Sequence, residues 1–101
     1  DGDVTIFESG AIVQYVLARY GQGRLVPDTA SADFPVYLQW LHYAEGMIMP
    51  PVNTIVVETI LLPPERRNEA NVERATKLLT RMLGAVDQHL AGRSYLAGAF
   101  S

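Results

Sequence analysis

Apolar residues recur at helical spacing across the middle of this 101-residue chain, and this pattern constrains the fold most strongly. They cover more than one stripe of a helix between positions 34 and 60: Phe34, Tyr37, Leu38, Trp40, Leu41, Tyr43, Met47, Ile48, Met49, Val52, Ile55, Val56, Val57 and Ile60. The spacing predicts a long helix that begins after Ser31 or Asp33 and ends near Leu62. A helix that is apolar on so many sides needs two partners, its own core and either a cleft or a second subunit.

Pro50 and Pro51 lie inside this predicted helix. Each proline lacks a backbone N–H and crowds the carbonyl group four residues earlier, at Gly46 and Met47. We therefore expect a kink or a local opening of the helix between Gly46 and Pro51. The alternative is that the two prolines end one helix and start another.

Two further helices are predicted on either side of the central one. The first runs from about Gly10 to Tyr20, and Gly21 is expected to close it in the left-handed conformation. The last follows a second Pro-Pro pair and has the clearest helical periodicity in the chain. Asn68 or Asn71 is expected to cap its start, and Gly92 to close its end.

The N-terminal residues read as irregular structure around one short strand. Asp1-Gly2 is a tight-turn dipeptide, and the alternation in Val4–Phe7 predicts a strand. Residues 22–32 are predicted to form a linker, because glycine, proline and aspartate interrupt any periodicity there.

Composition and charge exclude several kinds of function. A net charge of −3 offers no positive field for a phosphate backbone, so nucleic acid is not an expected partner. The chain has no cysteine, and its two histidines, His42 and His89, lack carboxylates at a spacing typical of zinc sites, so no metal is expected. No apolar run is long enough to span a bilayer, and we expect a cytoplasmic protein with no membrane contact.

Glu8 and Ser9 lie at the junction between the predicted strand and the first predicted helix. A helix start exposes unpaired backbone N–H groups and the positive end of the helix dipole, so it suits a carboxylate. The Ser9 hydroxyl can add a hydrogen-bond donor, and the Glu8 carboxylate can take an ammonium group. Together they suit an amino-acid zwitterion, although a serine at this position is also simply a common helix cap.

A wider string of residues resembles the glutathione S-transferases. Residues 1–12 (DGDVTIFESGAI) and 15–21 (YVLARYG) resemble the end of that family's thioredoxin-like domain. Residues 95–101 (YLAGAFS) resemble the segment before its sixth helix, and Trp40-Leu41 with the later Pro50 resembles its long fourth helix. These matches cover nearly the whole chain, and their order and spacing favour the resemblance more than any single match does.

The resemblance implies a mostly α fold that is an interior piece of a subunit about twice as long. It places the end of the thioredoxin-like domain, with one strand and one helix, at residues 1–21. The interdomain linker then covers residues 22–32, and part of the all-helical C-terminal domain covers residues 33–101. The family's thiol-activating residue and its cis-proline are expected upstream of Asp1, so no catalytic residue is assigned in this chain.

The resemblance also implies a function. In that family the Glu-Ser pair holds the γ-glutamyl group of the co-substrate glutathione, and this role carries over to Glu8 and Ser9. The glutathione thiolate then attacks a hydrophobic electrophile, and Tyr43 and Met47, one helical turn apart, are candidates for the substrate pocket, although such a pair is equally typical of plain core or of a subunit interface. The family's homodimer contacts map to about residues 10–20 and 32–62.

Two other functions fit the residues. A non-catalytic relative would keep the fold as a binding or scaffolding module and share the Glu-Ser pair or a remnant of it. A stand-alone helical interaction domain would instead fold by itself and ignore glutathione.

Overall fold

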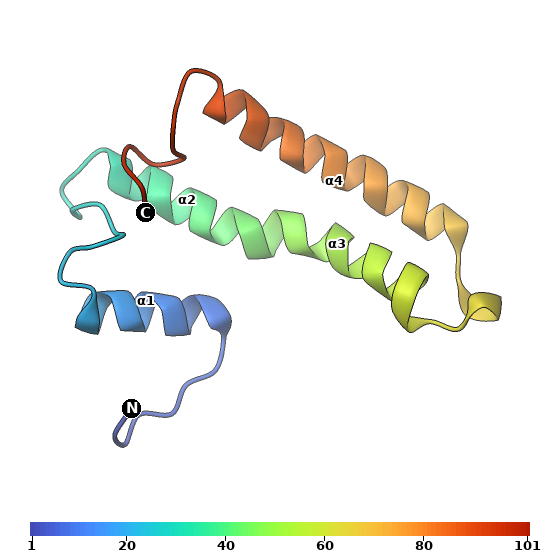
Figure 1. Ribbon diagram of the computed structural model, residues 1–101, viewed down its shortest axis with the longest axis horizontal. Coiled ribbons are helices and arrows are strands. Elements are labelled where there is room, and N and C mark those ends of the chain that lie inside the picture. Colours follow the sequence, from blue (N-terminus) through green and yellow to red (C-terminus); the bar gives the residue numbers. More distant parts are fainter. The chain divides into compact units, whose positions relative to one another are not determined.

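The computed structural model describes all 101 residues and contains four α-helices (Figure 1). These are α1 (Ser9–Tyr20), α2 (Asp33–Tyr43), α3 (Met49–Val56) and α4 (Glu69–Leu90). Two π-helical turns, η1 (Ala44–Ile48) and η2 (Val57–Leu61), follow α2 and α3, and a 3-10 turn, η3 (Pro64–Arg66), precedes α4. The chain divides into two compact units, one of residues 1–41 with 94–101 and one of residues 42–93. The predicted mostly α class is confirmed, while the predicted domain boundaries stay a prediction.

The strand predicted at Val4–Phe7 does not form, and this part of the prediction was wrong. A strand needs a neighbour that bonds its backbone N–H and C=O groups, and no other segment of the chain pairs with these residues. The one β-type pairing is an isolated bridge between Ala97 and Ala99. The Phe7 side chain is 83% exposed, so the alternation in this segment has no core to face.

The central helical stretch opens just before its prolines, as predicted. The Met49 N–H donates to the Ala44 carbonyl, five residues earlier, which is the spacing of a π-helix. Because Pro50 has no N–H, the Gly46 carbonyl lacks its usual partner four residues on. The local opening between Gly46 and Pro51 is therefore confirmed as a π-helical turn, and helical structure resumes in α3.

The end of α1 differs from the prediction. Gly21 has φ −69° and ψ −25°, which is right-handed, so the predicted left-handed cap at this residue was wrong. The left-handed residues come next, at Gln22 (φ 52°) and Gly23 (φ 76°). Glycine is favoured at position 21 for another reason. The Gly21 N–H donates to the Leu17 carbonyl over 2.9 Å, and at this close approach a Cβ atom would collide with that carbonyl oxygen.

The start of α4 is capped by Asn68, one of the two predicted residues. Its side-chain oxygen accepts hydrogen bonds from the N–H groups of Ala70 (3.0 Å) and Asn71 (3.4 Å). The buried carboxylate of Glu58, on η2, adds a second anchor by accepting from the Asn68 N–H (2.8 Å) and the Asn71 side-chain amide (2.7 Å). These bonds lower the pKa of Glu58, the Asn71 bond most, while burial opposes them.

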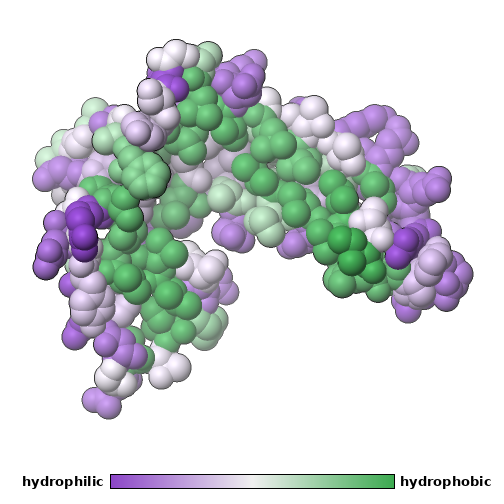
Figure 2. Space-filling view, in the orientation of Figure 1, coloured by the Kyte–Doolittle hydropathy of each residue, from purple (hydrophilic) through white to green (hydrophobic).

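Much apolar surface remains exposed on both units. The buried hydrophobic residues are Tyr37, Ala75 and Ala97, and no large side chain is completely buried. Figure 2 shows hydrophobic residues gathered over α1 and along α3. These faces include Ile12, Val13 and Val16 of α1 and Val57, Ile60 and Leu61 of η2, all at least 40% exposed. Every helix is either too short or too polar to cross a bilayer.

Candidate functional site at the start of α1

Glu8 and Ser9 form the entrance to α1, as the sequence predicts. Glu8 is the N-cap residue, and its carbonyl accepts the first helical bond from the Ile12 N–H over 2.9 Å. Its side chain makes no capping bond, and both side chains are exposed. The N–H groups of the first turn have no carbonyl four residues earlier within the helix. The entrance therefore presents amide donors, one hydroxyl and one carboxylate to an outside ligand.

The backbone of Glu8 is strained. Its φ of 76° with ψ of 113° lies outside the regions that side chains other than glycine adopt readily. Such residues cost about 1–3 kcal/mol each, persist only where their surroundings hold them, and cluster at ligand-binding sites. Nothing in the sequence signalled this strain, because glutamate has no preference for positive φ.

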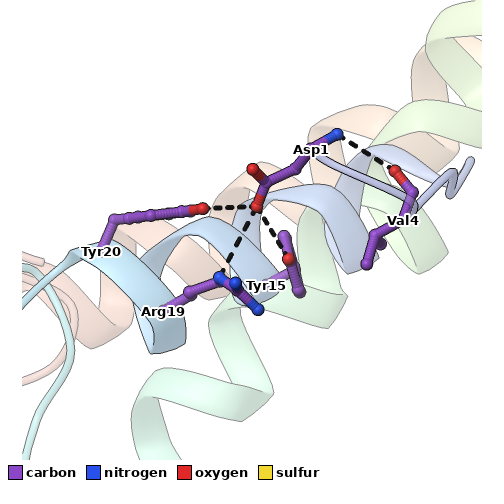
Figure 3. A network of polar contacts seen from close by, with 5 residues as sticks. All are labelled: Asp1, Val4, Tyr15, Arg19 and Tyr20. Carbon is purple, nitrogen blue, oxygen red and sulfur yellow. Dashed lines mark hydrogen bonds and ion pairs between the residues drawn. The ribbon is translucent and has the colours of Figure 1, made fainter.

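The residues before this entrance are fastened to the far end of α1 (Figure 3). The Asp1 carboxylate accepts a 2.9 Å hydrogen bond from the Tyr15 hydroxyl and another from the Tyr20 hydroxyl. The Arg19 Nε lies 3.6 Å from the same carboxylate oxygen. A turn follows, in which the Val4 N–H donates to the Asp1 carbonyl over 3.0 Å. We refer to the contacts of Asp1 with Tyr15, Arg19 and Tyr20 as the carboxylate clasp.

The Arg19 guanidinium is itself placed between two rings. Its carbon lies 5.9 Å from the centre of the Tyr15 ring and 5.7 Å from that of Tyr20, within the range of cation–π attraction. Sequence reasoning identified the Asp1-Gly2 turn but not its partners, because they lie 14 to 19 residues away.

A separate groove of about 550 Å³ lies within the first unit, and it contains neither Glu8 nor Ser9. Its walls are mainly apolar and come from α1, the predicted linker and α2. The residues that line it include Leu17, Val26, Pro27, Phe34, Tyr37 and Leu38. The rings of Phe34 and Tyr37 are stacked, with centres 6.3 Å apart.

The two candidate pocket residues lie in different surroundings. The Tyr43 hydroxyl donates to the Met82 carbonyl over 3.2 Å and lies 3.4 Å from the Met82 sulfur, so it joins the end of α2 to α4. The Met47 side chain, on η1, is 44% exposed. Their assignment to a substrate pocket stays a prediction. The structure brings together no group of three histidine, aspartate or glutamate side chains that could hold a metal ion.

Comparison with known proteins places this arrangement in context. No family model matches the chain. Glutathione S-transferase 4 of Zea mays is 37% identical over 99% of the chain and 45% of its own length. Elongation factor 1-gamma of Rattus norvegicus is 33% identical over 97% of the chain but only 21% of its own length. The chain thus spans about half of the transferase it matches and a fifth of the elongation factor.

Solved structures agree with the sequence relatives. A glutathione transferase from Pseudomonas putida, crystallised with one glutathione disulfide per subunit, superposes with a TM-score of 0.82 and 32% identity, covering 97% of this chain and 41% of that one. Ure2p5 from Phanerochaete chrysosporium, cocrystallised with 1-(S-glutathionyl)-2,4-dinitrobenzene, gives a TM-score of 0.86 at 26% identity over 99% of this chain and 46% of that one.

The sequence matches and the helical fold thus both relate this chain to the glutathione S-transferases. The resemblance seen in the sequence is therefore confirmed: this chain is related to the glutathione S-transferases along nearly all of its 101 residues.

Proposed function

We propose that the protein containing this chain binds glutathione at the entrance of α1 and conjugates it to a hydrophobic electrophile. In that reaction the glutathione thiol loses its proton, and its sulfur forms a bond to the electrophilic carbon as the leaving group departs. The observation that carries the proposal is the strained N-cap at Glu8, next to Ser9, in a fold shared with transferases that were crystallised with glutathione derivatives. The first-turn N–H groups and the Ser9 hydroxyl would hold the γ-glutamyl carboxylate, and the Glu8 carboxylate its ammonium group.

The chemistry needs one more group, which would lower the pKa of the glutathione thiol from about 8.5 so that the thiolate forms near neutral pH. No residue of this chain is assigned that role. Met47, exposed on η1, and the neighbouring Tyr43 are our candidates for the wall that receives the electrophile. A homodimer formed through the apolar surfaces of α1 and α2–η2, and a cytoplasmic location, belong to the same proposal.

The match to elongation factor 1-gamma supports a second candidate function. That protein is named for translation elongation, not for glutathione transfer, yet it matches this chain at 33% identity. The chain would then belong to a binding or scaffolding module that keeps the fold and has no transferase activity.

One experiment separates the two functions. The protein expressed from its complete open reading frame is titrated with glutathione by calorimetry, and the pKa of the bound thiol is followed by its ultraviolet absorbance. A transferase binds glutathione, lowers the thiol pKa below about 8.5 and displaces chloride from 1-chloro-2,4-dinitrobenzene. Binding with an unshifted thiol pKa and no conjugation would support the module instead. If the protein does not bind glutathione at all, the assignment of Glu8 and Ser9 to a glutathione site is wrong.

A further inference from the structure

We infer that the carboxylate clasp positions Glu8 and Ser9 for glutathione, so that Asp1, Tyr15, Arg19 and Tyr20 act as positioning residues at a distance from the ligand. This inference rests on the proposed glutathione site. It concerns how that site is held in shape, not which atoms touch the tripeptide.

The segment before α1 is tied at both of its ends. At one end, Glu8 enters α1, and its carbonyl accepts from the Ile12 N–H. At the other, the Asp1 carboxylate is bound to side chains of Tyr15 and Tyr20, from the second half of the same helix (Figure 3). Residues 1–8 therefore run back along α1, and the strained Glu8 lies at the point where the chain reverses into the helix.

A strained backbone conformation persists only where its surroundings leave the chain no easier path. The Glu8 side chain makes no capping bond that would fix its own backbone. The preceding turn is closed by the Val4 N–H on the Asp1 carbonyl, and the carboxylate clasp fastens that turn to α1. The clasp is thus the constraint that holds the far end of the segment.

The clasp is built from groups suited to a carboxylate. Two phenol hydroxyls donate to it, and the Arg19 guanidinium, lying near both tyrosine rings, supplies the opposite charge. The Asp1 and Arg19 side chains are 43% and 59% exposed, so each contact is screened by water. We therefore expect a moderate effect on ligand binding, not its loss.

The expected change in glutathione affinity follows from the fraction of molecules whose α1 entrance can bind the ligand. If loosening the clasp lets Glu8 relax, only part of the molecules keep a binding-competent entrance, and the apparent dissociation constant rises by the inverse of that fraction. Removing one hydrogen bond of ordinary strength corresponds to a rise of roughly 3- to 10-fold.

The test compares Asp1→Ala, Tyr20→Phe and the double variant in the protein expressed from its complete open reading frame. Asp1→Ala removes the hydrogen bonds from both tyrosines and the contact with Arg19, whereas Tyr20→Phe removes one of these bonds. Tyr20→Phe should raise the glutathione dissociation constant roughly 3- to 10-fold, and Asp1→Ala should raise it by at least as much. The double variant should show no rise beyond that of Asp1→Ala, because Asp1→Ala already removes the Tyr20 bond. Hydrogen exchange of the amides of residues 5–9 should speed up in all three. Tyr95→Phe, which removes an exposed hydroxyl outside the clasp, is the matched control and should leave both readouts unchanged.

The outcomes are distinguishable. If Ser9→Ala weakens glutathione binding while Asp1→Ala and Tyr20→Phe lower only the melting temperature, the clasp is merely structural and the inference is overturned, although the glutathione site stands. If the unmodified protein does not bind glutathione, the site and the inference fail together. A rise in the dissociation constant for both single variants, with no further rise in the double variant and none in Tyr95→Phe, supports the inference.

Discussion

The Glu58 carboxylate accepts a 2.7 Å hydrogen bond from the side-chain amide of Asn71 and thereby joins η2 to the first turn of α4. Its second oxygen accepts from the Asn68 N–H. A buried carboxylate at this place neutralises the positive end of the α4 dipole and gives partners to amide groups that a helix start leaves unpaired. These two hydrogen bonds to Glu58 therefore fix the start of α4.

The stability of the protein should depend on pH through Glu58. Because its pKa in the folded chain lies below the ordinary 4.5, its contribution is fully present above that value and is lost as the pH falls through the lowered pKa. Glu58→Gln should lower the free energy of unfolding at neutral pH, since an amide cannot accept both bonds as the carboxylate does. Urea denaturation from pH 7 down to about pH 3 measures both effects.

The exposed Glu65 of η3 provides the control for this experiment. Glu65→Gln should leave the free energy of unfolding and its pH dependence unchanged. The account of Glu58 would be contradicted if the Glu58→Gln variant and the unmodified protein lost stability in parallel over the acid range. The loss of stability in acid would then not come from protonation of Glu58.

The cap of α4 should be measurable separately. Asn68→Ala removes the side-chain oxygen that accepts from Ala70 and Asn71, and we expect it to cost about 0.5–2 kcal/mol in the free energy of unfolding. Asn53→Ala, at an exposed position inside α3, is the matched control and should cost nothing, because alanine favours a helix interior. Equal losses in the two variants would show that the cap is not what Asn68 contributes.

Two glycines should respond to the same substitution with opposite sign. Gly98 has φ 75°, and a Cβ atom there would collide with the Asp33 carboxylate, so Gly98→Ala should destabilise the fold by about 1–2 kcal/mol or more. Gly84 lies inside α4 with open space around it, so Gly84→Ala should stabilise by about 0.5–1 kcal/mol. Thermal unfolding of both variants checks the pair. A stabilising Gly98→Ala would show that this loop adopts another conformation.

The two candidate pocket residues should differ in what they affect. Tyr43→Phe removes the hydroxyl that donates to Met82, and should lower stability by about 0.5–1.5 kcal/mol with little change in the KM for the electrophile. Met47→Ala, at a 44% exposed position, should leave stability nearly unchanged and raise that KM. The reverse pattern would place the Tyr43 hydroxyl, and not the Met47 side chain, at the substrate.

The helices could be predicted from the sequence because their signals are local. Apolar spacing, the Asn68 cap and the effect of Pro50 on the preceding turn all act within a few residues of each other. The strand at Val4–Phe7 could not be judged in this way, since a strand exists only with a partner and its residues alone do not supply one.

The site was predictable only in part, for the same reason. Glu8 and Ser9 are neighbours in sequence, so their place at a helix start was visible. The positive φ of Glu8 and the bonds from Tyr15 and Tyr20 to Asp1 depend on how distant segments meet. Such contacts cannot be predicted from the local preferences of the residues that make them.

The central claim is that the entrance of α1 binds the γ-glutamyl end of glutathione, and calorimetric titration of Ser9→Ala in the protein from its complete open reading frame tests it most directly. With Ser94→Ala, an exposed serine elsewhere, as the control, Ser9→Ala should weaken glutathione binding by about 1–3 kcal/mol, the usual cost of a lost hydrogen bond to a charged group. A dissociation constant that is the same in the unmodified protein and both variants would contradict the account.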